Sequence, residues 1–309
     1  MAPHARRNKA CADSSRGQAI AGSDEIYTIG TWETADGLTL SFRDYAGRAD
    51  RPALLCLHGL TRNARDFGPL ADAFAGEWRL IVPEMRGRGM SDYARDPETY
   101  RIPNYLADVD ALLGHLSLEE YVGVGTSMGG LMLALMAARD GSRMKGVVLN
   151  DIGPVVEKAG LERIGEYVGL GRSFPTWMHA ARALREQARA DHPGFDIAAW
   201  LQHAKRMMVV GNNGRIAFDY DMKIAEPFVR DGEKETADLW PAFKALGGRP
   251  GLLLHGELSD LLSAETAAHM AADIDGMDVA LIPQTGHAST LEEPEAQAAI
   301  ASLLARVAT

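Results

Sequence analysis

The stretch that most constrains the fold is Gly-Thr-Ser-Met-Gly at residues 125–129, a Gly-x-Ser-x-Gly pattern. An apolar run at 121–124 precedes it, and a run of helical character at 130–138 follows it. A strand that turns abruptly into a helix at such a pattern is a nucleophile elbow, in which glycines leave room for neighbouring backbone. We therefore expect Ser127 to project from the end of a strand, above the N-terminus of the next helix.

The rest of the chain alternates between apolar runs of strand length and segments of helical periodicity. A hairpin with an Asp-Gly turn comes first, and the helices fall between the later strands. This alternation predicts an α/β fold with a mostly parallel sheet covered by helices on both faces. The expected strands are 26–34, 38–45, 53–57, 79–83, 121–124, 146–150, 251–255 and 278–283, and the expected helices outside the middle region are 67–74, 106–116, 130–138, 234–246, 264–270 and 293–307.

The alternation breaks near residue 153, and about eighty residues follow with helical periodicity and no convincing strand. Helices are expected at 161–168, 177–190 and 197–210. Two hypotheses stand: the large apolar residues of this region pack its helices together, or the region is a helical lid whose inner face lines an apolar pocket. Under the second hypothesis the candidate substrate-contacting residues of this region are Trp177, Met178, Met207, Met208 and Phe218. His58, from the core, is a further candidate.

This pattern divides the 309 residues into a tail at 1–24, a core formed by 25–153 and 233–309, and a cap at 154–232. The tail has a basic start but no apolar stretch of the kind found in secretory signals, so we expect a cytoplasmic protein. A net charge of −10 argues against a nucleic-acid partner, and no apolar run is long enough to span a membrane. The two cysteines, Cys11 and Cys56, predict neither a disulfide nor a metal site.

A serine hydroxyl at an elbow needs a neighbouring base, and the base needs a carboxylate to orient it. His287 follows the last predicted strand, and Asp260 follows the strand before it. Both therefore belong to loops at the carboxyl edge of the sheet, where Ser127 emerges and where ligands bind in open α/β sheets. We predict Ser127 as nucleophile, His287 as base and Asp260 as the orienting acid.

Two other carboxylates compete with Asp260 for the last role. Asp151 follows the strand at 146–150, and Glu257 is three residues before Asp260. Asp260 could also serve as a helix cap, although Ser263 can cap the following helix. The histidines in or beside helices are expected to be surface groups; they are His115, His179, His192, His203 and His269.

An oxyanion formed during attack by Ser127 needs two backbone N–H donors. One is expected from Met128, the residue after the nucleophile, and the other from Leu60, in the loop after the strand at 53–57. His58, two residues before Leu60, is more consistent with a role in shaping this loop than with catalysis.

Together these segments resemble the α/β-hydrolase superfamily, in its capped, serine esterase-like branch. The resemblance spans residues 26–307. It implies an eight-stranded sheet, a helical cap after the sixth strand and no cofactor, with Arg86 as a scaffold residue. The motifs that carry it are His-Gly-Leu-Thr at 58–61, Arg-Gly-Arg-Gly-Met-Ser-Asp at 86–92, the elbow at 125–129, Gly-Glu-Leu-Ser-Asp at 256–260 and Gly-His at 286–287.

Enzymes of this fold that open epoxides or cleave carbon–halogen bonds carry Asp at the elbow, whereas this chain carries Ser127. The resemblance therefore implies acyl transfer through an acyl-serine, and we expect a hydrolase of small to medium, largely apolar esters or lactones. Cleavage of carbon–carbon bonds in ring-cleavage diketones, enol-lactone hydrolysis, acyl transfer and a ligand receptor that retains the triad stay open as alternatives. Monomer and homodimer are both compatible with the sequence.

Overall fold

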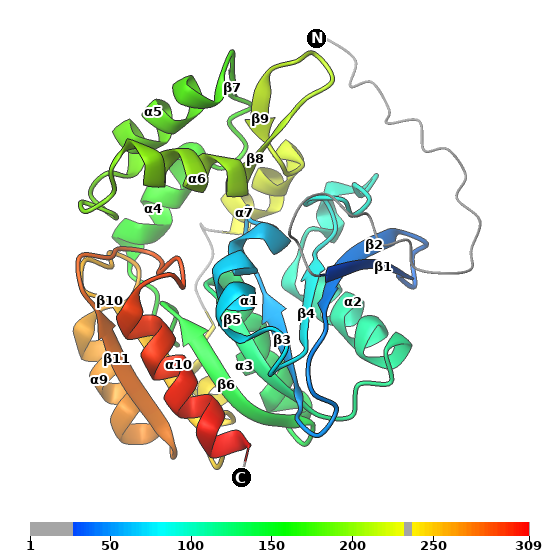
Figure 1. The fold of residues 1–309 in the computed structure, drawn as a ribbon, viewed down its shortest axis with the longest axis vertical. Coiled ribbons are helices and arrows are strands. Elements are labelled where there is room, and N and C mark those ends of the chain that lie inside the picture. The colour runs from blue at the N-terminus through cyan, green and yellow to red at the C-terminus, as the bar shows by residue number, and fades with distance from the viewer. Residues whose placement is uncertain (1–26, 232–236, 309) are drawn as a thin grey trace.

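The computed structural model describes residues 27–231 and 237–308 (Figure 1). The predicted tail at 1–24, including Cys11, lies outside the described residues. Cys56 is buried and carries a free thiol. No helix in the described part of the chain combines the length and the apolar character needed to cross a bilayer.

The centre of the molecule is the predicted mostly parallel sheet of eight strands, in the order β1-β2-β4-β3-β5-β6-β10-β11. The hairpin β1–β2 pairs antiparallel and joins β4 antiparallel, and every other pairing is parallel. Each strand begins and ends within two residues of its predicted position. The strands are β1 (Tyr27–Glu33), β2 (Thr39–Tyr45), β3 (Ala53–Leu57), β4 (Leu80–Glu84), β5 (Tyr121–Thr126), β6 (Met144–Asn150), β10 (Gly251–Gly256) and β11 (Met277–Ile282).

Helices cover both faces of this sheet, because successive side chains of the central strands point to opposite faces. Leu54 and Cys56 of β3 pack with a 3-10 turn, η1 (Ala64–Phe67), and with α1 (Gly68–Phe74) and α10 (Pro294–Val307). Leu55 and Leu57 pack in the second core, to which the helices of the other face contribute: α2 (Ile102–His115), α3 (Met128–Asp140), α8 (Trp240–Lys244) and α9 (Ala264–Asp273).

The inserted segment, residues 158–231 between β6 and α8, lies beyond the carboxyl edge of the sheet (Figure 1). It begins with α4 (Lys158–Tyr167) and continues with α5 (Trp177–Ala188) and α6 (Ile197–Met207). The 3-10 turn η3 (Met222–Ile224) and α7 (Ala225–Asp231) close it. The helices appear close to where periodicity placed them.

Two details of the sequence prediction were wrong, one inside the inserted segment and one after it. The inserted segment contains three short antiparallel strands in the order β7-β9-β8: β7 (Ser173–Phe174), β9 (Ile216–Phe218) and β8 (Met208–Val210). Strands of two or three residues carry too little alternation to be distinguished from the end of a helix. Of the helix expected at 234–246, residues 234–236 lie outside the described residues. In the remainder only α8 is helical, with Pro241 in its first turn, where proline is favoured.

Candidate active site

The elbow has the strained geometry that its glycines predict. Ser127 adopts φ 51°, ψ −117° between β5 and α3, a backbone conformation that costs a non-glycine residue on the order of 1–3 kcal/mol. A Cβ at Gly125 would lie 2.5 Å from the carbonyl carbon of Gly129, and a Cβ at Gly129 would lie 2.0 Å from the carbonyl oxygen of Leu57. Both positions therefore exclude any side chain, which explains the Gly-x-Ser-x-Gly pattern.

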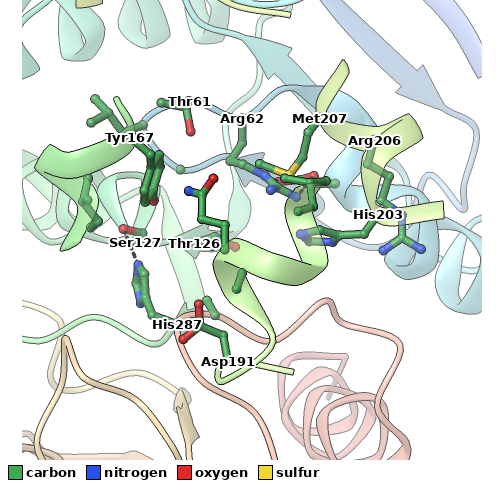
Figure 2. A pocket seen from close by; sticks show the side chains of 18 of the residues that line it. Thr61, Arg62, Thr126, Ser127, Tyr167, Asp191, His203, Arg206, Met207 and His287 are labelled. Carbon is green, nitrogen blue, oxygen red and sulfur yellow. Dashed lines mark hydrogen bonds and ion pairs between the residues drawn. The ribbon is translucent and has the colours of Figure 1, made fainter. Parts of the chain in front are cut away.

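His287 connects the serine to a carboxylate. Its Nε2 lies 2.9 Å from Ser127 Oγ (Figure 2), and its Nδ1 lies 2.8 Å from Oδ2 of Asp151. The hydroxyl can donate only to a ring nitrogen without a proton, so this geometry favours the tautomer protonated at Nδ1. A serine held in this way by an imidazole and a carboxylate can lose its proton as it attacks an electrophile.

Asp151, directly after β6, is fully buried and closely surrounded by donors. Its Oδ1 accepts a hydrogen bond from the Gly256 N–H at 2.9 Å, and Oδ2 accepts one from Ser259 Oγ at 2.5 Å as well as the one from His287. These partners come from β10 and the loop that follows it. The loop after β10 thus orients the carboxylate after β6 and does not itself supply the partner of His287.

The prediction that Asp260 pairs with His287 was therefore wrong. Asp260 accepts two hydrogen bonds from Arg163 of α4, at 2.5 Å from Nε and 2.7 Å from Nη2. The hydrogen bonds and charge of Arg163 hold the pKa of Asp260 below its ordinary value. The alternative acid Glu257 accepts from the backbone N–H of Gln284, and Ser263 caps α9 as expected. Asp260 thus links the sheet edge to the inserted segment.

The loop after β3 passes beside Ser127. A Cβ at Gly59 would lie 3.7 Å from Cβ of Ser127. The carbonyl of Leu60, the next residue, accepts two hydrogen bonds from the buried Arg88, at 2.9 and 2.7 Å. The Leu60 N–H has no hydrogen-bond acceptor within the described residues, and Met128 begins α3, where helix N–H groups have no partner within the helix. Both N–H groups predicted for an oxyanion hole are thus available.

His58 does not contact the cavity, so the prediction that it contacts substrate was wrong. It is completely buried, accepts a hydrogen bond from the Met85 N–H at Nε2 (3.1 Å) and lies with Nδ1 2.7 Å from the Gly59 carbonyl. Burial, together with the nearby charge of Arg88, lowers the pKa of His58 to about 4. A neutral His58 therefore fixes the loop that carries Leu60, in agreement with the role in loop shaping.

Ser127 and His287 open into a cavity of about 470 Å³ between the sheet edge and the inserted segment (Figure 2). Its volume is in the range of small-molecule sites. Of the predicted contact residues, Met207 and Phe218 line it. Met178 is exposed, and Trp177 and Met208 pack inside the inserted segment. Helical periodicity identifies a buried face but not whether that face meets a cavity or a core.

Two histidines expected at the surface lie in the cavity wall. His192 is buried and stacks on Phe195, with ring centroids 4.4 Å apart, and its pKa falls to about 4 because of burial. His203 meets the edge of Trp200, and burial also lowers its pKa well below the usual value. The signal that could have found His203 is its spacing from Met207 and Trp200 on one face of α6.

Four arginines that were not predicted to contact the cavity add positive charge to its lining: Arg62, Arg163, Arg172 and Arg206. Asp66, Glu166 and Asp191 also line the cavity. The wall is therefore more polar than the predicted apolar pocket. In the described part of the chain, no group of three or more His, Cys, Asp or Glu side chains is arranged to hold a metal ion.

Comparison with known proteins agrees with this architecture. A family model for the alpha/beta hydrolase fold matches residues 52–294. The chain belongs to this family. A relative from Cupriavidus necator, the 3-hydroxybutyrate-oligomer hydrolase, is 35% identical over 269 residues, covering 85% of this chain and 91% of the relative.

Two further proteins extend the comparison. The crystal structure of an alpha/beta hydrolase from Novosphingobium aromaticivorans shares 55% identity and a TM-score of 0.88, covering 91% of this chain and 99% of its own. The 2-(acetamidomethylene)succinate hydrolase of Mesorhizobium japonicum is 25% identical over 84% of this chain and 88% of the relative. The family and these relatives identify the protein as an α/β hydrolase.

Proposed function

We propose that the protein is a serine hydrolase that cleaves carboxylic esters through an acyl-Ser127 intermediate. The observation that carries this proposal is the hydrogen-bond chain from Ser127 through His287 to Asp151, which opens into a cavity. Nothing in this chemistry requires a group beyond the protein's own side chains and water.

In the proposed first half-reaction, Ser127 Oγ attacks the ester carbonyl while His287 Nε2 accepts its proton. Asp151 stabilises the imidazolium that forms. The N–H groups of Leu60 and Met128 donate to the oxyanion, and removal of one such donor typically costs about 100- to 1,000-fold in rate. His287 then gives its proton to the departing alcohol. In the second half-reaction, His287 accepts a proton from water, which attacks the acyl-serine. His287 then returns this proton to Ser127 Oγ as the bond between Oγ and the acyl carbon breaks and the acid leaves.

The relatives narrow the class of substrate. An oligomer of a hydroxy acid is joined by ester bonds, and the 3-hydroxybutyrate-oligomer hydrolase covers nearly the whole chain at 35% identity. We therefore favour short hydroxyacid esters over lactones, and over the carbon–carbon bonds of diketones. The inserted segment acts as the cap that encloses the acyl chain, and the protein works in the cytoplasm.

Hydrolysis of a series of p-nitrophenyl esters, from acetate to dodecanoate, tests this proposal. We expect turnover by the wild type with an optimum at a short chain, because the cavity is small. The Ser127→Ala variant, whose side chain is not packed in either core, should fold normally and lose at least about 10⁴-fold in kcat/KM. Ester turnover that persists in this variant would disprove the assignment of the nucleophile.

A further inference from the structure

One end of the cavity is distinguished by its charge. Arg206 and His203 of α6 stand at the side of the cavity opposite Ser127 and His287 (Figure 2), and Arg62 lies between the two sides. The spacing of His203, Arg206 and Met207 places all three on one face of α6. A substrate with its scissile bond at Ser127 would extend toward this cationic end.

The charge at this end is only partly balanced. Arg62 donates to Asp66 at 2.5 and 2.7 Å, so these two side chains largely neutralise each other. Arg206 forms an ion pair with Glu292, whose side chain is half exposed. An ion pair with an exposed partner contributes little stabilisation, because water screens the charges. Burial lowers the pKa of Arg206; Asp66 opposes this effect, and Arg62 adds to it. An anion beside Arg206 would relieve the cost of its burial.

His203 reports the same electrostatic environment. Its Nδ1 is buried and has no hydrogen-bond partner in residues 27–231 and 237–308. Besides burial, the positive charges of Arg62 and Arg206 lower its pKa. The ring is therefore neutral near pH 7, and it can donate a hydrogen bond to an oxygen without adding a charge.

The backbone of Arg206 is hydrogen-bonded to the segment after β3 that carries Leu60, so its position relative to that loop is fixed. Its carbonyl accepts hydrogen bonds from Nδ2 of Asn63 (3.0 Å) and from Nε of Arg65 (2.9 Å). Both donors follow Leu60 by a few residues. The last turn of α6 is thus tied to the same loop that borders Ser127, and a ligand group held at Arg206 would lie at a defined separation from the nucleophile.

We propose, building on the ester hydrolase function above, that Arg206 and His203 form a subsite for the free carboxylate at the end of the substrate. The enzyme then selects esters that carry a terminal carboxylate, such as oligomers of hydroxy acids, and cleaves the ester bond that reaches Ser127 when the acid end occupies this subsite. The methylene groups between them pack on Met207 and Phe218.

The test compares the dimer of 3-hydroxybutyrate as the free acid with the same dimer converted to its primary carboxamide. Wild-type enzyme should cleave the acid with a kcat/KM about 10- to 100-fold higher, as expected for a charge-assisted hydrogen bond. Arg206→Gln should bring this ratio close to one. Lys205→Gln removes a neighbouring exposed cation that is not part of the cavity wall, so it is the matched control and should keep the wild-type ratio.

Equal turnover of the acid and the amide by the wild type would overturn the subsite, as would an unchanged ratio in Arg206→Gln. Failure to cleave either dimer while p-nitrophenyl butyrate is hydrolysed would also overturn it. In that case the proposed esterase function would stand, whereas inactivity toward every ester would refute that function. Should Arg206→Gln not fold, wild-type inhibition decides: 3-hydroxybutyrate should inhibit at least 10-fold more tightly than its amide, and equal inhibition would contradict the proposal.

Discussion

The sheet edge and the inserted segment form opposite walls of one cavity, and they are built by different rules. At the sheet edge the polar groups are held by short hydrogen bonds from several loops, as around Asp151. In the inserted segment the wall consists of packed aromatic rings and of arginines paired with carboxylates, as at His192 and Arg163. The sheet edge therefore holds the reacting groups in one geometry, whereas the inserted segment provides side chains that can recognise a substrate.

Asp151 and Asp260 give the sharpest form of this comparison. Both follow strands of the same sheet at the same edge. Asp151 is completely buried and bonds His287, whereas the side chain of Asp260 is 32% exposed and bonds Arg163 of the inserted segment. Position at a strand end therefore does not decide which carboxylate orients the imidazole; the donors that surround it do.

The largest expected effect is a loss of kcat that distinguishes Asp151 from Asp260. Asp151→Asn should lower kcat for a p-nitrophenyl ester by about 10⁴-fold, because an amide cannot hold the imidazole in the required tautomer or stabilise its cation. Asp260→Asn should remain within about 10-fold of the wild type, since it does not contact His287. Steady-state kinetics of both variants provide the measurement, and a larger loss in Asp260→Asn than in Asp151→Asn would reverse the assignment.

A smaller loss of kcat is expected when Arg88 is substituted. This side chain donates two hydrogen bonds to the Leu60 carbonyl at the sheet edge. Arg88→Lys keeps the positive charge but cannot make both hydrogen bonds to that carbonyl. We expect kcat to fall by about 10- to 100-fold with little change in KM, because the Leu60 N–H would be less well directed at the oxyanion. A change confined to KM would argue that Arg88 affects binding instead.

His192 of the inserted segment should make the free energy of unfolding depend on pH in mild acid. His192 has a folded pKa of about 4, below the unfolded value of about 6.5. Between these values the unfolded chain binds the proton and the folded chain does not, so stability is lost as pH falls through this range. This histidine alone should remove about 2 kcal/mol between pH 7 and pH 5, at about 1.4 kcal/mol per pKa unit.

Urea unfolding at the two pH values checks this expectation. The variant His192→Phe keeps an aromatic ring beside Phe195 and removes the titrating group, so its loss of stability on acidification should be smaller than that of the wild type by about the same ~2 kcal/mol. Parallel losses in both proteins would show that His192 does not remain neutral in the folded state.

The smallest effect concerns the link between the two walls. Asp260→Asn removes the ion pair with Arg163, which is partly exposed, and should cost about 1 kcal/mol of stability near pH 7. Because Arg163 lowers the pKa of Asp260 in the folded state, this contribution is present above the unfolded value and is lost as pH falls through the folded one. Thermal melts should therefore differ at pH 7 and converge in strong acid; a constant difference would contradict the ion-pair account.

Much of the fold was predictable because its determinants are local. The buried strands are continuous apolar runs, and the elbow requires glycine at two positions for steric reasons. His287 could be chosen because it is the histidine in a loop after the last strand. The choice between Asp151 and Asp260 depends on long-range donors, such as Ser259, that no local pattern reveals. For the same reason, the contacts of His203 and Met207 with the cavity could not be distinguished from ordinary helix packing.

The central claim, that Ser127 is made nucleophilic by His287 and Asp151, is tested most directly by covalent labelling. Each variant would be treated with a fluorophosphonate, and the modified residue and the rate of modification would be followed by mass spectrometry. We predict a single adduct on Ser127 in the wild type, none in Ser127→Ala, a rate at least about 100-fold lower in Asp151→Asn and a nearly unchanged rate in Asp260→Asn. Modification of another residue, or wild-type rates in Asp151→Asn, would contradict the account.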